Sequence, residues 1–185
     1  MVRRPMNSRL LILDLDETLV FATEEKLARG EDFRVGPYFV YKRPGLESFI
    51  DFAFNHFKVA TWTSSSRNYA HGTVSAIFQL PERLEFGWAR ERCTRKSDRE
   101  TGRSYWIKDL KKVRRLGWPL ADVAVVDDSP EKLERSYGNH IRVTPFVGDP
   151  TDDELRNLQG YLAWLKEVPN VRFVDKRNWR TAQVA

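Results

Sequence analysis

The chain has 185 residues, enough for one domain with a substantial core, and its apolar fraction of 41% lies slightly below that of an average globular domain. No apolar run approaches the roughly 20 residues that span a bilayer, the basic segment 1–9 lacks a signal-peptide pattern, and the single cysteine, Cys93, excludes an intramolecular disulfide. The net charge of +5 favours an anionic partner such as nucleic acid, acidic protein or a phosphorylated substrate, although an ordinary basic surface gives the same value. We therefore expect a cytoplasmic protein, or a nuclear one if the source is eukaryotic, without membrane contact.

Apolar runs and helical patterns alternate along the sequence. In chain order we predict a strand at Leu10–Leu13, a strand at Tyr38–Lys42, a helix from Leu46, a strand at Phe57–Trp62, a helix over Ser66–Ile77, short strands or loop over Pro81–Trp106, a strand at Val123–Val126, a helix from about Pro130, a strand at Ile141–Val143 and a helix over Asp152–Leu165. This order predicts an α/β fold, a Rossmann-like and mainly parallel sheet flanked by helices. Ligands of such sheets bind beyond the carboxyl ends of the strands.

Two carboxylates follow the first predicted strand. Asp14 comes directly after four apolar residues, and Asp16 lies two positions further on. Aspartates often do no more than shape a turn, but a charge at the end of a buried strand is costly without a partner. A divalent cation supplies such a partner, and oxygen ligands suit Mg²⁺.

Three other segments place polar groups after apolar runs. Thr63 and Ser64 follow a strand and precede a helix, where hydroxyls and free amides can cradle phosphate. Taken alone, this segment favours simple helix capping by Ser65 or Ser66. Lys108 follows an aromatic and apolar run. Asp127 and Asp128 repeat the pattern of the first strand, and their adjacent negative charges again imply a nearby cation.

Taken together, these motifs resemble the haloacid dehalogenase superfamily, in its branch of RNA polymerase C-terminal-domain phosphatases (the FCP/SCP type, or NLI-interacting-factor domain). The matching motifs run over about residues 10–165 and comprise Asp14-Leu15-Asp16-Glu17-Thr18-Leu19, Lys42-Arg43-Pro44-Gly45, Thr63-Ser64-Ser65 with Tyr69-Ala70, Arg90-Glu91-Arg92-Cys93, Lys108-Asp109-Leu110 and Asp127-Asp128-Ser129-Pro130. So many ordered motifs do not arise by chance.

The resemblance implies an aspartate nucleophile. Asp14 is expected to attack phosphorus and form an aspartyl-phosphate, while Asp16 protonates the leaving oxygen and later takes a proton from water. Mg²⁺ is expected to bind Asp14, the backbone carbonyl of Asp16, and Asp128. Because the superfamily members that remove halogens lack the second aspartate, Asp16 indicates a phosphatase.

The resemblance also implies the groups that support this chemistry. Thr63, Ser64 and Lys108 are expected to bind the phosphate oxygens. Asp127 is expected to orient Lys108, and Thr18 to shape the turn after the first strand.

We expect a single domain over residues 1–185, with a core at about 9–168, an insert at about 80–106 and a tail from 170 that the pattern does not assign. Neither gap between the motifs can hold the full cap domain of many relatives. An open site favours a bulky substrate, and the resembled branch implies phosphorylated Ser or Thr of a protein, bound to a monomer. The aromatic residues Phe86, Trp88 and Trp106 then either contact that peptide or pack a small core.

Three alternatives remain. The basic charge fits a polynucleotide end phosphatase, and the fold also fits a phosphoprotein-binding module with little activity. Cys93 and Arg99 have the spacing of a cysteine phosphatase, but the loop between them has no glycine, so we interpret that match as accidental.

Overall fold

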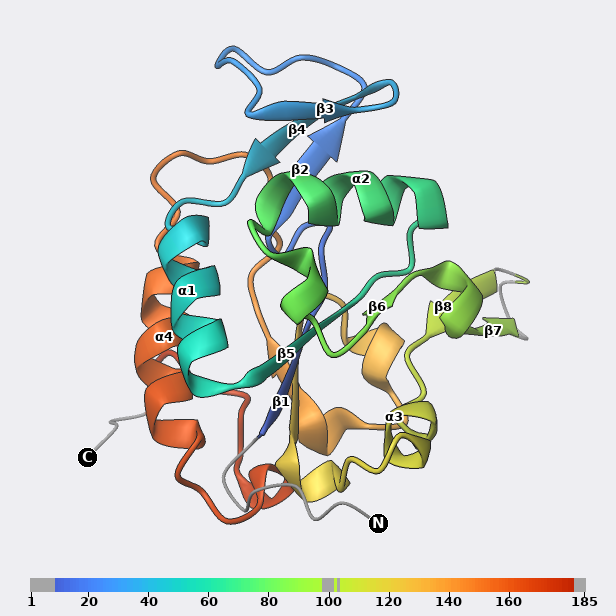
Figure 1. Cartoon of the computed structure of the whole chain (residues 1–185), viewed down its shortest axis with the longest axis vertical. Helices are drawn as coiled ribbons and strands as arrows, with labels where there is room; N and C mark the ends of the chain where they lie inside the picture. The colour runs from blue at the N-terminus through green and yellow to red at the C-terminus, as the bar shows by residue number, and fades with distance from the viewer. Residues whose placement is uncertain (1–8, 98–101, 103, 182–185) are drawn as a thin grey trace.

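The centre of the molecule is a five-stranded parallel sheet. The computed structural model describes residues 9–97, 102 and 104–181 (Figure 1). The strand order is β10-β9-β1-β5-β6, and every neighbouring pair is parallel. The strands are β1 (Leu10–Leu13), β5 (Lys58–Trp62), β6 (Gly87–Trp88), β9 (Val123–Asp127) and β10 (His140–Arg142). The predicted α/β fold with a mainly parallel sheet is confirmed.

The register of the sheet sets up the site. Leu13 pairs with Thr61 of β5 on one side and with Val126 of β9 on the other. The residue after each strand therefore reaches the same edge. All four residues of β1 and all five of β9 are buried, as expected for strands covered on both faces.

Helices cover both faces of the sheet. They are α1 (Leu46–His56), α2 (Arg67–Ile77), α3 (Lys111–Arg115) and α4 (Glu154–Leu165). Figure 1 shows α1 and α4 side by side on one face and α3 on the other. Leu11 and Leu13 of β1 pack into the core beneath α1 and α4, whereas Leu10 and Ile12 pack with Val113 of α3. The alternation of side chains along a strand explains these two cores.

Two smaller sheets are attached to this centre. The strands β2 (Val20–Thr23), β4 (Tyr38–Lys42) and β3 (Phe33–Val35) form an antiparallel sheet above α2 in Figure 1, in the order β2-β4-β3. The hairpin of β7 (Thr94–Ser97) and β8 (Ser104–Ile107) lies in the predicted insert. The segment Tyr38–Lys42 is thus a strand as predicted, but in an antiparallel sheet. The sequence analysis did not predict β2, β3 or α3.

The helix predicted from Pro130 is wrong in its length. Only a 3₁₀ turn over Pro130–Leu133 forms. The carbonyl of Lys132 accepts a hydrogen bond from the amide of Lys108 at 2.7 Å, and Ser136 donates to Leu133 instead. The i to i+4 pattern that an α-helix needs is therefore not built. Other 3₁₀ turns lie at Pro81–Arg83, Arg90–Arg92, Leu120–Asp122, Tyr137–Asn139 and Val171–Phe173.

The tail that the pattern left unassigned packs onto the sheet. Val171 and Trp179 are buried in the main core, and the indole of Trp179 donates to the carbonyl of Arg142 at 2.7 Å. The residues 171–181 are therefore part of the folded unit. Within the part of the chain that the structure describes, none of the helices combines the length and apolar character that crossing a bilayer requires.

Candidate active site

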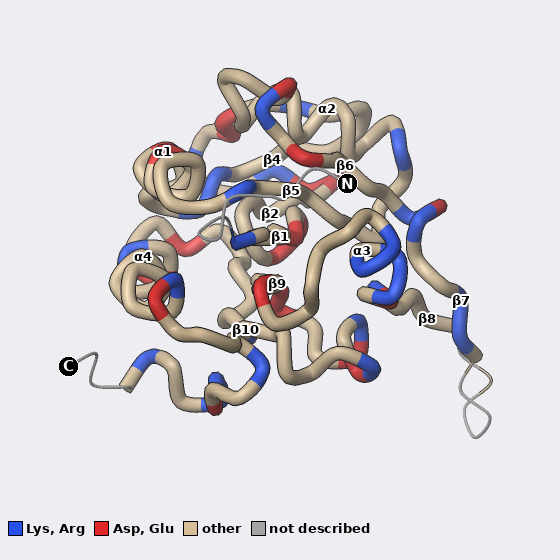
Figure 2. The backbone as a smooth tube through the Cα atoms, turned by 60° about the horizontal axis from the view of Figure 1, so that its bottom comes forward, with Lys and Arg blue, Asp and Glu red and all other residues tan. Residues whose placement is uncertain are grey.

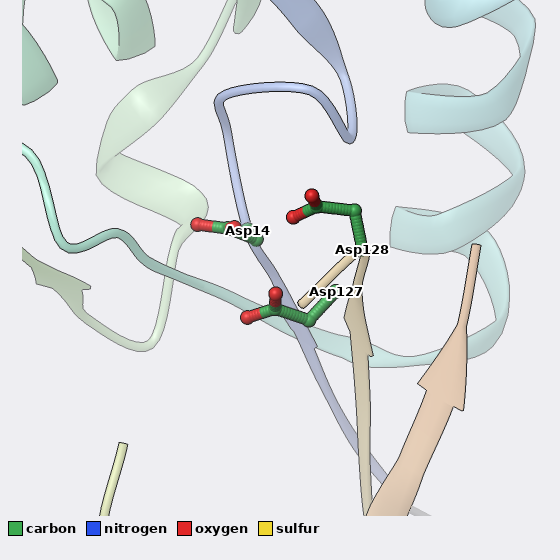
Figure 3. A group of neighbouring side chains, drawn as sticks. All are labelled: Asp14, Asp127 and Asp128. Atoms are coloured by element: carbon green, nitrogen blue, oxygen red, sulfur yellow. The ribbon is translucent and has the colours of Figure 1, made fainter. Parts of the chain in front are cut away.

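Side chains from four segments meet at the carboxyl edge of the sheet. Asp14 follows β1, Thr63 follows β5, and Asp127 with Asp128 ends β9. Lys108 comes from the end of the hairpin strand β8. Figure 3 shows the carboxylates of Asp14, Asp127 and Asp128 converging from the ends of β1 and β9.

Asp14 is completely buried between two lysines. Its carboxylate contacts the ammonium of Lys108 at 2.8 Å through Oδ1 and that of Lys132 at 2.9 Å through Oδ2. Burial alone raises the pKa of Asp14, but attraction to Lys108 and Lys132 outweighs it and leaves the pKa below its usual value. The side chain is therefore an ionised carboxylate at neutral pH, the form that a nucleophile requires.

Asp127 fixes the position of Lys108. Both side chains are fully buried, and Lys108 Nζ lies 2.5 Å from Asp127 Oδ2 while it also contacts Asp14. Burial, followed by repulsion from Asp14, raises the pKa of Asp127. The ammonium thus bridges two carboxylates, which is the arrangement expected of a positioned cationic clamp.

Three carboxylates form a group that can hold a metal ion. One oxygen each from Asp14, Asp127 and Asp128 lies within 4.8 Å of the others. Asp128 is partly exposed and accepts a hydrogen bond from the Ser129 hydroxyl at 3.0 Å. Such a set of hard oxygen donors fits Mg²⁺.

The carboxylate of Asp16 is held by three hydroxyls from the loop after β5 and from α2. Ser65 Oγ donates to Oδ2 at 2.6 Å, Tyr69 OH donates to Oδ1 at 2.6 Å, and Thr63 Oγ1 donates to Oδ2 at 3.2 Å. Burial, followed by repulsion from Asp16, raises the pKa of the Tyr69 hydroxyl, so it remains a donor. Hydroxyl groups therefore contact both oxygens of the Asp16 carboxylate.

The loop after β5 joins the site to the insert. Thr63 Oγ1 accepts a hydrogen bond from the amide of Ser65 at 3.0 Å and donates one to Asp16, so this hydroxyl links the loop to Asp16. Ser64 contributes its carbonyl, which accepts from Arg90 Nε at 2.6 Å. The guanidinium of Arg90 lies 5.8 Å from the ring centre of Trp106. The insert therefore reaches the loop predicted to bind phosphate.

The turn after β1 is tight and buried. Glu17 has a φ of 55°, and the amides of Leu19 and Val20 both donate to the carbonyl of Leu15. Thr18 is fully buried, and its carbonyl accepts from Arg43 Nη1 at 3.1 Å. The place of Thr18 fits its predicted role in shaping this turn.

Burial, and after it the charges of Asp16 and Asp128, raises the pKa of Glu17 to about 7. The turn thus adds a further acidic side chain beside the site. The sequence analysis gave Glu17 no role.

Sequence reasoning missed three residues that contact the carboxylates of Asp14 or Asp16. Ser65 and Tyr69 belong to a motif that the resemblance had already matched. Their positions just before and within the predicted helix could have indicated that they contact the site. Lys132 was not singled out at all. Its only signal was its spacing four residues after Asp128, in a segment predicted to be helical.

The aromatic insert residues are mostly packed. Phe86 stacks on Trp88 with ring centres 4.1 Å apart, and Trp88 meets Trp62 edge-on at 4.8 Å. Trp88 is buried in the core beneath α3, whereas Trp106 is partly exposed. Phe86 is partly exposed like Trp106, but Trp106 also lies beside Arg90, which contacts the loop after β5.

Cys93 does not have the properties of a nucleophilic cysteine. Its side chain is buried and burial raises the pKa of its thiol, whereas a nucleophile needs the thiolate. Its proposed partner, Arg99, lies outside the described residues.

Comparison with known proteins decides the family. Residues 9–172 match the model of the family described as NLI interacting factor-like phosphatase. The chain belongs to this phosphatase family. The resemblance drawn from the motifs is thereby confirmed, and the family places the chain among enzymes that hydrolyse phosphate esters.

Curated relatives of this chain include viral, animal and fungal proteins. The CTD phosphatase-like protein of Invertebrate iridescent virus 3 is 29% identical, over 85% of this chain and 97% of its own length. CTD nuclear envelope phosphatase 1 of Xenopus laevis is 28% identical, over 92% of this chain and 72% of its own.

Solved structures show the same fold. The structure of the fission yeast RNA polymerase II CTD phosphatase Fcp1 bound to beryllium fluoride aligns with a TM-score of 0.54 at 19% identity, over 76% of this chain and 42% of that chain. A second Fcp1 structure aligns with a TM-score of 0.54 at 18% identity, over 93% of this chain and 58% of that chain. This chain thus spans about half of the length of each of these two solved chains.

Proposed function

We propose that the chain is a Mg²⁺-dependent phosphomonoester hydrolase that forms an aspartyl-phosphate on Asp14 and acts on phosphorylated Ser or Thr of proteins. The observation that carries the proposal is the state of Asp14, a fully buried and ionised carboxylate held between Lys108 and Lys132. Asp16, two residues after Asp14, supplies a second carboxylate in a different environment, where three hydroxyls hold it. Two carboxylates with different surroundings can divide nucleophilic and proton-transfer roles.

The reaction proceeds in two displacements. An oxygen of Asp14 attacks phosphorus, the bond from phosphorus to the ester oxygen breaks, and Asp16 gives a proton to the departing oxygen. Asp16, now a carboxylate, then takes a proton from a water molecule that attacks the phosphoryl group. The bond to Asp14 breaks, phosphate leaves, and both aspartates return to their starting forms.

The other side chains bind and orient the phosphoryl group. Lys108, fixed by Asp127, faces the nucleophile and offers its ammonium to the phosphate oxygens. The amide of Thr63 already donates to the carbonyl of Trp88, so the loop with Thr63 and Ser64 would bind phosphate through its hydroxyls and the amides at the start of α2. Asp14, the backbone carbonyl of Asp16 and Asp128 would hold Mg²⁺, which would supply positive charge to offset the negative charge of the phosphate and carboxylates.

The names of relatives and the segments between the motifs support the proposed substrate class. Relatives of this chain are named as CTD phosphatases. Among the described residues, the first gap between motifs holds the antiparallel sheet, α1 and β5, and the second holds α2, β6 and the hairpin β7–β8. The partly exposed Trp106 beneath Arg90 lies beside the loop after β5 and can contact a peptide that flanks the phosphorylated residue. We expect the active form to be a monomer of one domain.

A polynucleotide end phosphatase is the second candidate. Figure 2 shows Lys and Arg on α3 and on the hairpin β7–β8, toward the same side of the molecule. The exposed Lys111, Arg114, Arg115 and Arg95 belong to these segments. Basic side chains near the site would also attract a nucleic-acid backbone.

Turnover of three substrate classes tests the proposal. Ser- and Thr-phosphorylated peptides, oligonucleotides with 3′- or 5′-phosphate and a small sugar phosphate are each assayed with Mg²⁺ and with EDTA. We expect Mg²⁺-dependent turnover with the peptides hydrolysed fastest. After acid quench of a reaction with ³²P-labelled peptide, the wild type should carry a hydroxylamine-labile label that Asp14→Asn lacks. Turnover that persists in EDTA would refute the mechanism, and a preference for the oligonucleotides would favour the second candidate.

A further inference from the structure

Lys132 lies in the middle of the acidic group that is proposed to bind metal. Its Nζ is 2.9 Å from Asp14 Oδ2, 3.6 Å from Asp128 Oδ1 and 3.7 Å from Asp127 Oδ1. These are the three residues whose carboxylate oxygens cluster within 4.8 Å. The phosphatase motifs of the sequence include Lys108 but not Lys132, and the proposed reaction gives Lys132 no step.

The ammonium and a divalent ion cannot bind these oxygens independently. Mg²⁺ binds oxygen at about 2.0–2.1 Å. An ion at that distance from Asp14 Oδ2 would therefore lie within about 5 Å of Nζ, in a site walled by buried side chains. Two positive charges at such a separation repel each other strongly where water does not screen them.

The charges of the site explain why a lysine is held there. Asp14, Asp127 and Asp128 bring three carboxylates together, and Lys108 compensates one of them. Buried carboxylates without a counter-charge are costly, and a second ammonium reduces that cost. The ammonium of Lys132 therefore neutralises part of the negative charge that a bound cation would neutralise.

We propose that Lys132 is a tethered counter-ion of the metal site, which neutralises the carboxylates before metal binds and is displaced toward solvent when Mg²⁺ enters. The inference rests on the proposed function, because it takes Asp14 and Asp128 as metal ligands. Its consequence is a lowered affinity for Mg²⁺, since each binding event must break the contacts of Lys132.

The position of Lys132 permits this exchange. Its side chain is 16% exposed, whereas those of Lys108 and Asp14 are fully buried, so only Lys132 has a path toward solvent. It is carried by the short turn Pro130–Leu133, and a lysine stem has four rotatable carbons that can redirect the ammonium. Lys108 lacks this freedom because Asp127 holds it from behind.

Binding of Mg²⁺ to the substrate-free protein tests the inference by calorimetric titration. Lys132→Met keeps an unbranched stem of similar shape and removes the ammonium, so we expect it to bind Mg²⁺ about tenfold more tightly than the wild type, or better. Lys132→Arg keeps the charge and should stay near the wild-type affinity. Lys111→Met removes an exposed charge of α3 and serves as the matched control, with unchanged affinity.

Thermal unfolding of the same proteins provides the second measurement. In EDTA, Lys132→Met should melt below the wild type, because three carboxylates then face a single ammonium. Saturating Mg²⁺ should raise the melting temperature of Lys132→Met more than that of the wild type. If this variant folds only with Mg²⁺ present, that dependence itself supports the inference.

The outcomes separate the two proposals. If the wild type binds Mg²⁺ and Lys132→Met binds it equally or more weakly, the counter-ion role is overturned while the proposed function stands. If neither protein binds Mg²⁺, the metal-dependent function is overturned, and the inference with it.

Discussion

The hydroxyl of Tyr69 offers a direct test of the role given to Asp16. It donates a hydrogen bond of 2.6 Å to Asp16 Oδ1, and the Tyr69 ring packs edge-on against Tyr38 with centres 5.6 Å apart. Tyr69→Phe removes the hydrogen bond and keeps the ring contact, so the fold should be unaffected. A hydrogen bond to a charged group contributes about 1.5–3 kcal/mol. If all of it serves to position the acid in the transition state, its loss lowers kcat by about 10- to 150-fold.

The choice of leaving group makes the assay specific. A serine alkoxide needs a proton as it departs, whereas a p-nitrophenolate leaves without one. We therefore expect Tyr69→Phe to lose most of its kcat on a phosphoserine peptide and far less on p-nitrophenyl phosphate. Tyr161→Phe is the control, because the Tyr161 hydroxyl is buried without a hydrogen-bond partner among the described residues and its removal should leave both rates unchanged.

Two results would refute the reasoning. Equal losses on both substrates would mean that Tyr69 supports the site in general rather than proton transfer by Asp16. An unchanged rate on the peptide would mean that the remaining hydroxyls of Ser65 and Thr63 hold the carboxylate by themselves.

Other predictions concern stability and are measured by denaturant unfolding. Arg43 is fully buried and makes two hydrogen bonds of 2.7 Å to Asp152, so Arg43→Ala should lower the free energy of unfolding by about 3–5 kcal/mol, and a loss below 1 kcal/mol would contradict this. Gly148 has a φ of 93°, and an added Cβ would lie 2.6 Å from a side-chain carbon, so Gly148→Ala should lower the free energy of unfolding by about 1–3 kcal/mol. Gly160 lies in the interior of α4 with open space around it, so Gly160→Ala should raise that free energy by about 0.5–1 kcal/mol. Equal effects of the two substitutions would disprove the argument. Burial lowers the pKa of His140, so the unfolded chain binds its proton more readily, and the stability that His140 contributes above pH 6.5 is lost as pH falls. His140→Gln should therefore show a shallower loss of stability between pH 7 and 5 than the wild type, and an unchanged slope would refute this.

Local pattern was enough to predict that Asp14 and Asp127 lie at the ends of buried strands. The run of four apolar residues before Asp14 and the run before Asp127 each form a buried strand of the central sheet. Since parallel strands end at one edge, polar residues after two such runs must approach each other, and the register places Leu13 opposite Val126. The same logic located Thr63 after β5.

Pattern failed where partners are far apart or where an element is short. The strands β2 and β3 have three or four residues each and only partly buried faces, so their periodicity is weak. The sequence from Pro130 has a helical pattern, but the amide of Lys108 takes the carbonyl of Lys132 that a helix would use. No local pattern reveals this contact, because Lys108 is distant in the sequence.

The sequence by itself determined the fold class and the identity of the chemical groups, because burial and turn preferences are written in neighbouring residues. Only the tertiary structure decided which groups touch. Tyr69 contacts Asp16 across 53 residues and Lys132 contacts Asp14 across 118. These contacts depend on how the loop after β5 and the turn after β9 close over the end of β1. The charge balance around Asp14 is therefore a property of the packed sheet edge and not of any one motif.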